Sequence, residues 1–217
     1  LLAGVLVKVS EGDINFAMEI LAGLGVYSLT VITGLVLMVF VIYPLLVGKF
    51  GKVKYRVFLK AISPAQLLAF STSSSAATLP VTMERVEEKL GVSKKVSSFV
   101  LPLGATINMD GTSLYQAVAA VFIAQSFNID LSLMDQLAIL LTATLASIGS
   151  AAVPGAGLVM LTIVLGLFPQ IPIEGIGIVF AVDRILDMCR TTVNVTGDAT
   201  VATIVARSEG ELNLPNG

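Results

Sequence analysis

The chain has 217 residues, of which 55% are hydrophobic and only 13% charged, and its mean hydropathy is +0.92. An ordinary soluble domain carries about twice that share of charged residues, so the composition predicts an integral membrane protein embedded in a lipid bilayer. The formal net charge of −2 and the lack of histidine exclude a basic nucleic-acid surface and metal sites built on imidazole.

The N-terminal region is apolar from its first residues. The sequence starts at Leu1, without a methionine, a basic segment or a cleavage site, so we expect a chain that lacks its N-terminal part rather than one that opens with a signal peptide. Residues 1–56 are then expected to hold the end of one transmembrane helix, a following transmembrane helix at about 15–48, and a basic cytoplasmic loop. The single cysteine, Cys189, excludes an internal disulfide.

Long stretches without charge alternate with short charged connectors. Each stretch, alone or joined to its neighbour, is long enough to enter a hydrocarbon core of about 30 Å. Lysines and arginines flank residues 61–83 on both sides, whereas only acidic residues flank 136–173. By the positive-inside rule, both ends of 61–83 are expected in the cytoplasm and both ends of 136–173 outside.

A segment whose two ends lie on one side of the membrane does not cross it. Residues 61–83 are therefore predicted to form a re-entrant helical hairpin that turns within 71–80, and residues 136–173 a second one that turns within 149–157. The serines of the first tip and the glycines of the second are typical of residues that interrupt a helix. Such non-helical backbone is tolerated at membrane depth only inside protein or along a cavity. Thr78-Leu79-Pro80 predicts the start of the next helix.

These elements predict an all-α membrane protein, with transmembrane helices and two oppositely oriented re-entrant hairpins. A transport core is expected over residues 57–207, and its parts are a hairpin at 57–92, a broken helix at 96–127, a hairpin at 131–168 and a helix at 174–206. Residues 208–217 are expected to form a cytoplasmic tail. Because hairpin plus helix occurs twice with opposite orientation, the pattern is the inverted repeat typical of secondary transporters.

Two polar segments lie where lipid would exclude them. In Asn108-Met109-Asp110-Gly111-Thr112, a break in the helix would free backbone carbonyls beside a carboxylate, and such oxygen ligands suit sodium. The second segment is a stripe on one face of the last helix, at about 100° per residue, formed by Asp183, Asp187, Arg190, Asn194 and Asp198. Charges in a membrane segment cost about 2.5–3.5 kcal/mol each, so this stripe is expected to line a substrate or ion path.

The stripe combines a cation with carboxylates. The planar guanidinium of Arg190 is expected to bind a substrate carboxylate, and the alternative is a structural ion pair with Asp187 or Asp183. Asp187 is expected to hold a substrate ammonium group, unless it pairs with Arg184 or Arg190. Together these two residues would recognise a zwitterion with an acidic side chain.

The remaining polar residues suggest a cation site and an anion site. Asp110 and Asp198, with Asn108 and Asn194, are expected to bind a small cation, and the alternative is a carboxylate pair that shares a proton. The serine run 73–75 is either a polar turn or an anion site at a helix N-terminus.

Four motifs carry a resemblance to a known family. In the order of the chain they are SSSAATLP (73–80), LPLGATINMDGT (101–112), ASIGSAAVPGAG (146–157) and DMCRTTVNVTGD (187–198). They resemble the dicarboxylate/amino acid:cation symporters, the glutamate transporter family, over residues 1–207. The resemblance covers only the C-terminal half of the family's chain, so the N-terminal scaffold half is expected to be absent.

The resemblance implies the glutamate transporter fold, a homotrimer, and an elevator-like movement of the transport domain. It also implies L-aspartate or L-glutamate as substrate, Na⁺ as coupling ion, no other cofactor, and no enzymatic activity. Its substrate-binding positions correspond here to Ser73, Ser74, Ser75, Thr112, Val153, Gly157, Asp187, Arg190, Thr191 and Asn194. Its cation-binding positions correspond to Gly104, Thr106, Asn108, Asp110, Ser147, Ile148, Ser150, Asn194 and Asp198.

Departures from the family pattern narrow the expected function. Potassium-coupled animal members carry a Glu where Gln116 stands, which argues against potassium and proton counter-transport here. Dicarboxylate-only relatives lack the carboxylate at position 187 and neutral amino-acid relatives lack the arginine at 190, so an acidic amino acid is favoured. We expect a bacterial-type inner membrane and a cytoplasmic C-terminus.

Other functions are open on sequence alone. They are a proton-coupled glutamate or C4-dicarboxylate symporter, a passive anion channel and, more remotely, an intramembrane aspartyl protease with Asp110 and Asp198 as its catalytic pair. Against the protease, Thr196-Gly197-Asp198 lacks the first glycine of the Gly-x-Gly-Asp motif, and Arg190 would have no task.

Overall fold

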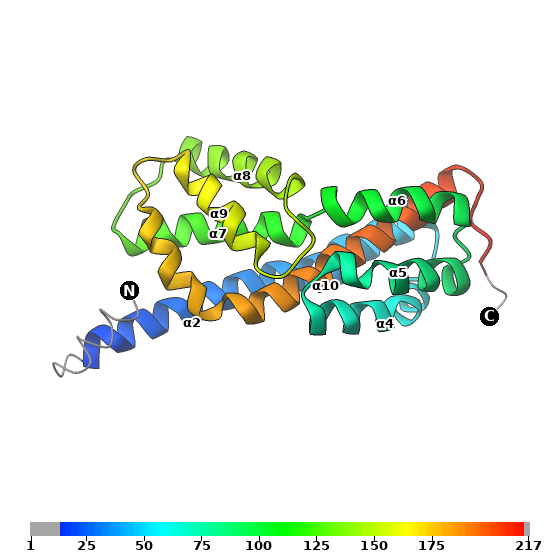
Figure 1. Cartoon of the computed structure of the whole chain (residues 1–217), viewed down its shortest axis with the longest axis horizontal. Coiled ribbons are helices and arrows are strands. Elements are labelled where there is room, and N and C mark those ends of the chain that lie inside the picture. Colours follow the sequence, from blue (N-terminus) through cyan, green and yellow to red (C-terminus); the bar gives the residue numbers. More distant parts are fainter. Residues whose placement is uncertain (1–13, 215–217) are drawn as a thin grey trace.

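Helices form almost all of the regular structure in residues 14–214, the part of the chain that the computed structural model describes (Figure 1). In chain order they are α2 (Ile14–Leu37), η1 (Met38–Ile42), α3 (Tyr43–Leu46), η2 (Val47–Gly51), α4 (Tyr55–Thr72), α5 (Ser75–Leu90), α6 (Lys94–Ile107), α7 (Asp110–Ser126), α8 (Leu133–Ile148), α9 (Ala156–Gly166), η3 (Ile173–Gly175) and α10 (Ile176–Ser208). The predicted all-helical fold is confirmed for this range. The helix end expected before residue 14 and the last three residues of the expected tail lie outside the described residues.

The first helix is long and apolar. Among the described residues, it is the one helix whose length and composition would let it cross a membrane, over Ile20–Gly51 with a mean hydropathy of 2.5. Two π-helical turns, η1 and η2, interrupt it on either side of α3. Such turns are rare and often lie at functional sites. Tyr43, the first residue of α3, is the buried side chain between them.

Helices α4 and α5 form a side-by-side pair joined by two serines (Figure 1). Ser73 adopts a left-handed conformation with φ of 53° and ends α4. Ser74 then caps α5, because its Oγ accepts a hydrogen bond of 3.1 Å from the backbone N–H of Ala77. The prediction that a helix starts at Thr78-Leu79-Pro80 was therefore wrong: α5 begins at Ser75, and Pro80 lies inside it.

Helices α6 and α7 follow one another with a short break between them. Ile107 ends α6, Asn108 and Met109 have non-helical backbone angles, and Asp110 begins α7. The interruption expected at 108–112 thus lies at its first two residues.

Helices α8 and α9 form a second pair, joined by the non-helical residues 149–155. Ser132 and Asp135 form a capping box at the start of α8, in which the Ser132 hydroxyl and N–H both donate to the carboxylate. These hydrogen bonds lower the pKa of Asp135.

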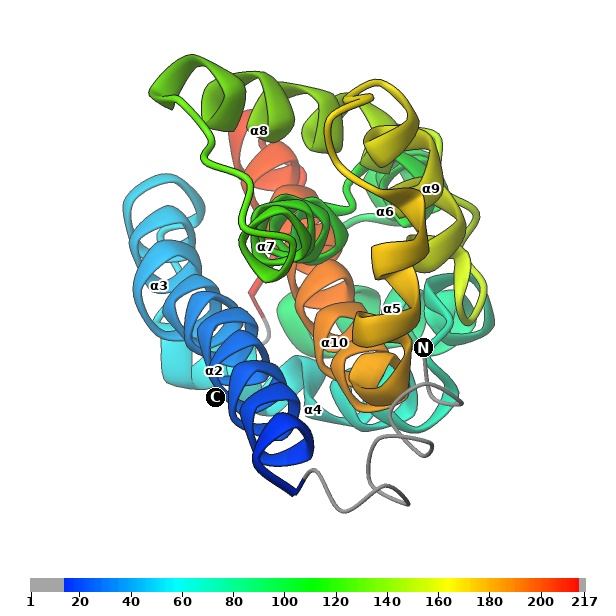
Figure 2. The same ribbon diagram turned by 90° about the vertical axis from the view of Figure 1, so that its left-hand side faces the viewer.

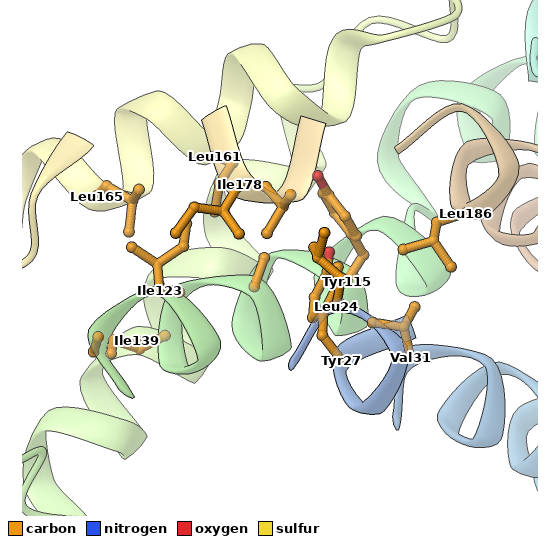
Figure 3. Packing of buried hydrophobic residues seen from close by; sticks show 14 of the residues in the cluster. Leu24, Tyr27, Val31, Tyr115, Ile123, Ile139, Leu161, Leu165, Ile178 and Leu186 are labelled. Atoms are coloured by element: carbon orange, nitrogen blue, oxygen red, sulfur yellow. The ribbon is translucent and has the colours of Figure 1, made fainter. Parts of the chain in front are cut away.

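Helix α10 is the centre of the packing. It contacts α2, α4, α5, α6, α7 and α9, and it runs between the α4–α6 group and the α7–α9 group (Figure 1). Viewed from the end, α7 is surrounded by α2, α8, α9 and α10 (Figure 2). The main hydrophobic cluster lies there, with Tyr115 and Ile123 of α7 among apolar residues of α2, α9 and α10 (Figure 3). The polar stripe of α10 is therefore enclosed by other helices.

Candidate functional site

Arg190 is held by two carboxylates from its own helix. Its Nε and Nη2 donate to Asp187 Oδ1 at 3.1 and 2.9 Å, and its Nη1 lies 3.0 Å from Asp183 Oδ1. The contact with Asp183 is close enough for an ion pair but is not aligned as a hydrogen bond. Spacings of three and seven residues place all three side chains on one helical face. All three are buried, and Arg190 is only 1% exposed.

Neighbouring helices shape the space around the guanidinium. The Cζ atom of Arg190 lies 3.8 Å from the centre of the Tyr115 ring, a cation–π contact from α7. Gly157, in the first turn of α9, also packs closely against the Arg190 guanidinium. A Cβ at this position would lie 2.9 Å from Nη2. The glycine therefore lets α9 approach Arg190 directly.

The tips of the two helix pairs meet beside this arginine. Ser74 Oγ donates to the carbonyl of Ala152 at 2.7 Å, and the N–H of Ala76 donates to the same carbonyl at 3.3 Å. Asp187 Oδ2 accepts from the N–H of Gly155 at 2.9 Å. One carboxylate thus links Arg190 to the loop between α8 and α9.

A small cavity of about 10 Å³ lies between these tips, roughly the space of one water molecule. It is lined by residues of the first tip, the α6–α7 break, the second tip and the α10 stripe. Eight of the ten predicted substrate residues line it, namely Ser73, Ser75, Thr112, Val153, Gly157, Asp187, Thr191 and Asn194. Ser74 lies behind the lining as the cap of α5, and Arg190 lies behind Gly157 and Asp187.

Hydrogen bonds fix the part of the cavity nearest to the break. The Asn194 side chain accepts from the N–H of Gly111 at 2.8 Å and donates to Thr112 Oγ1 at 3.0 Å. Gln116 is fully buried on α7, the helix of Gly111 and Thr112. Its Nε2 donates to the Gly157 carbonyl at 3.4 Å. Its Oε1 has no hydrogen-bond partner within the described residues.

A second polar cluster surrounds the break between α6 and α7. Asn108 Nδ2 donates to Asp198 Oδ1 at 3.0 Å, and the N–H of Gly111 donates to Asp110 Oδ1 at 3.0 Å. The Tyr43 hydroxyl donates to Asp110 Oδ2 at 2.5 Å and also lies 3.1 Å from the Val193 carbonyl oxygen.

Two glycines make room for this cluster. A Cβ at Gly104 would lie 2.6 Å from Asp198 Oδ1. A Cβ at Gly197 would lie 2.7 Å from Asn108 Nδ2 and 3.1 Å from Asp110 Oδ2. Five predicted cation-binding residues are therefore close together: Gly104, Asn108, Asp110, Asn194 and Asp198. Carboxylate, amide and carbonyl oxygens are the ligands that hard cations take.

The other predicted cation-binding residues lie on α6, at the end of α8 and, for Ser150, in the loop that follows α8; the two helices contact each other. Thr106 is exposed, and its hydroxyl donates to the Leu103 carbonyl. Ser147 and Ser150 are buried, whereas Ile148 is 42% exposed. Within the described residues, the N–H of Ser150 donates to the Ser147 carbonyl at 3.0 Å, and no hydrogen bond joins Thr106 to the other three. The structure therefore places them in one region without showing a coordination geometry.

A much larger groove of about 1040 Å³ lies between α2, α7 and α8. Its lining, from Ile20 to Ile178, contains no charged side chain and none of the predicted site residues. Size alone would select this groove. We assign the candidate site to the small cavity because the buried charges converge there.

Asp183 was given no part in substrate or cation binding and was considered only as an alternative ion-pair partner of Arg190. The structure shows that pair, together with the pair between Arg190 and Asp187. One contributor was missed from the sequence. Tyr43 lies 67 residues from Asp110 in sequence, and no motif marked it. Arg184, proposed as a possible partner of Asp187, is exposed instead and lies off the stripe.

Buried charges beside an interrupted helix, where the tips of two helix pairs meet, are typical of membrane transporters. The sequence profile described as the sodium:dicarboxylate symporter family matches residues 3–208, and the chain belongs to this family. It is therefore a membrane protein from a family of transporters.

Curated relatives share almost half of the residues. The chain is 47% identical to an excitatory amino acid transporter of Caenorhabditis elegans over 84% of its own length and 36% of that protein. It is 45% identical to excitatory amino acid transporter 1 of Mus musculus and 48% identical to excitatory amino acid transporter 3 of Oryctolagus cuniculus. These matches cover 94% and 92% of the chain and 37% of each relative. The chain thus spans little more than a third of the relatives it matches.

Proposed function

We propose that the protein is a secondary active transporter that couples uptake of an acidic amino acid, aspartate or glutamate, to sodium. The observation that carries this proposal is the buried group of Arg190, Asp183 and Asp187 beside a cavity that most of the predicted substrate residues line. Relatives named excitatory amino acid transporters, almost half identical to this chain, support the same substrate class.

Each charge of the substrate has a partner in this proposal. The side-chain carboxylate binds the Arg190 guanidinium together with Thr112, and the ammonium group binds Asp187. The main-chain carboxylate takes hydrogen bonds from Thr191, Asn194 and the backbone of Ser75. Val153 and Gly157 belong to the lid that covers the substrate. Binding requires the α8–α9 loop to move away from Asp187, because the present cavity is far smaller than an amino acid.

Sodium ions neutralise the second cluster. One ion takes Asp198 with carbonyl oxygens of Gly104, Asn108 and Asn194, and another takes Asp110 with Asn108. A further ion takes Thr106 with carbonyls of Ser147, Ile148 and Ser150. Since unpaired carboxylates in low dielectric are costly, cation binding favours the arrangement of α7 and α10 that forms the substrate site.

The membrane arrangement is part of the proposal. The α4–α5 and α8–α9 pairs are re-entrant hairpins of opposite orientation, within a transport core at 57–207 that has an inverted repeat. This core moves like an elevator within a homotrimer whose scaffold the N-terminal half of the protein supplies. The membrane is a bacterial-type inner membrane, with residues 208–217 in the cytoplasm. The protein performs no enzymatic reaction.

Calorimetry on the full-length protein tests the coupling. Aspartate affinity is expected to rise steeply with sodium, and equal affinity in sodium and choline buffers would refute the proposal. Uptake of radiolabelled aspartate into proteoliposomes, with sodium and proton gradients imposed separately, distinguishes sodium coupling from proton coupling. Uptake against a gradient distinguishes a transporter from a passive anion channel.

Substitution of Arg190 tests the substrate assignment. Arg190→Cys is expected to abolish uptake of aspartate and glutamate while a neutral amino acid such as serine still binds. Retained aspartate uptake in this variant would contradict the role given to the guanidinium.

A further inference from the structure

A strongly basic segment follows the first helix and has no part in the site described above. Residues 49–60 carry five cationic side chains and no acidic one, and we call these five residues the basic patch: Lys49, Lys52, Lys54, Arg56 and Lys60. All five are exposed. The patch lies where the apolar helix Ile20–Gly51 ends and α4 begins.

These five cations have no acidic partner within the described residues. The ion pairs within 4 Å in residues 14–214 involve Lys95 and Arg190, and none involves the patch. The second basic group of the chain differs in this respect. Arg85, Lys89, Lys94 and Lys95 are interspersed with Glu84, Glu87 and Glu88, and Lys95 also pairs with Glu211 at 3.5 Å. Of the two basic groups, the basic patch is therefore the one whose positive charge is not balanced by acidic side chains nearby.

The backbone holds the patch in a defined orientation. Val53 is 3% exposed, whereas its neighbours Lys52 and Lys54 are exposed, so the buried valine fixes both lysines toward the outside. The Tyr55 hydroxyl donates to the carbonyl of Val39, and Phe58 is fully buried. The segment is thus anchored to the long helix at η1.

Exposed apolar side chains adjoin the cations. Phe50 is 50% exposed, and the Nζ atom of Lys49 lies 5.4 Å from the centre of its ring. Leu45, 63% exposed, precedes the patch, and Val57, 49% exposed, lies within it. Cations beside aromatic and aliphatic groups at the end of an apolar helix match the boundary between lipid headgroups and acyl chains.

We propose that the basic patch binds the headgroup phosphates of anionic phospholipids. Lysines and arginines next to a membrane attract anionic lipids, and the neighbouring apolar side chains provide the contact with acyl chains that a soluble anion or an acidic protein would not need. This interaction surface goes beyond the transport function and does not depend on it.

Native mass spectrometry of the full-length protein tests the patch, with phosphatidylglycerol and phosphatidylcholine of identical acyl chains as probes. The test variant is Lys49→Gln, Lys52→Gln and Lys54→Gln together. The matched control is Lys89→Gln, Lys94→Gln and Lys95→Gln together, which removes the same charge from the compensated group. Each Lys or Arg near an anionic surface contributes about 1 kcal/mol, or roughly fivefold in affinity.

The preference for phosphatidylglycerol over phosphatidylcholine is therefore expected to fall at least tenfold in the patch variant and less than twofold in the control variant. An unchanged preference in the patch variant, or an equal loss in both variants, would overturn the proposal. Salt gives a second test that needs no substitution: the preference of the unaltered protein should fall as ionic strength rises, and a preference insensitive to salt would contradict it.

Discussion

Gly157→Ala tests whether the close approach of α9 to Arg190 controls binding of the acidic substrate. The added methyl group would lie 2.9 Å from Nη2 and 3.0 Å from Cζ of the guanidinium, shorter than a normal van der Waals contact. Arg190 is held between two carboxylates and the Tyr115 ring, so it has little freedom to move away. Extra methyl groups in packed interiors cost about 1–3 kcal/mol. Aspartate affinity should therefore fall by roughly 5- to 150-fold, as measured by calorimetry in sodium buffer.

The same helix offers a matched control. Gly166 ends α9, and no atom lies within 4 Å of a Cβ built there, so Gly166→Ala should leave aspartate affinity unchanged. A double-mutant cycle with Arg190→Cys isolates the contact, because the stability cost of Gly157→Ala should largely vanish once the guanidinium is gone. If Gly157→Ala binds aspartate as well as the unaltered protein does, or if its cost persists without Arg190, the reasoning fails.

Three further variants test contacts around the site. Asp183→Asn removes one buried partner of the arginine and should destabilise the protein by about 3 kcal/mol in detergent unfolding; no loss would show that the remaining carboxylate suffices. Tyr43→Phe removes the donor that holds Asp110, so the half-saturating sodium concentration for aspartate binding should rise about tenfold, whereas an unchanged or lower value would contradict a positioning role. Ser74→Ala removes a helix cap and the contact with Ala152, worth about 2 kcal/mol together, and should speed hydrogen exchange at the α8–α9 loop; unaltered exchange there would argue against the contact between the tips.

The features that follow from local rules were predictable from the sequence. Helical periodicity placed the five stripe residues on one face, and all five are buried. The helix is interrupted within the expected segment, at Asn108 and Met109, whereas Asp110 and Gly111, the poor helix formers that motivated the prediction, lie in the first turn of α7. The start of α5 was misplaced because a proline was preferred over a serine as the start signal. The Ser74 side chain caps the helix well before Pro80, which the helix interior accommodates.

Contacts between distant segments were not predictable in this way. The Tyr43 hydroxyl reaches Asp110 from α3, which lies between two π-helical turns and packs against α10. The contact between Ser74 and Ala152 joins residues 78 positions apart, and it depends on how two helix pairs face each other across α10. Residue spacing does not encode such crossings. The motif resemblance therefore indicated which residues belong to the site, whereas the structure supplies their present partners.

The present partners of Arg190 bear on how binding and closure are linked in the proposed transporter. Two carboxylates and one guanidinium leave one surplus negative charge. When a substrate carboxylate takes the place of Asp187 at the guanidinium, Asp183 stays as the permanent partner and Asp187 becomes available for the substrate ammonium group. The guanidinium and the ammonium group then each keep an opposite charge, and the main-chain carboxylate of the substrate is satisfied by hydrogen bonds from Thr191, Asn194 and the Ser75 backbone. Because Asp187 also accepts from the N–H of Gly155, the same exchange breaks a bond to the α8–α9 loop. The substrate ammonium group and the α8–α9 loop thus compete for the Asp187 carboxylate. A neutral amino acid would displace the loop, but it has no side-chain carboxylate to replace Asp187 at the Arg190 guanidinium.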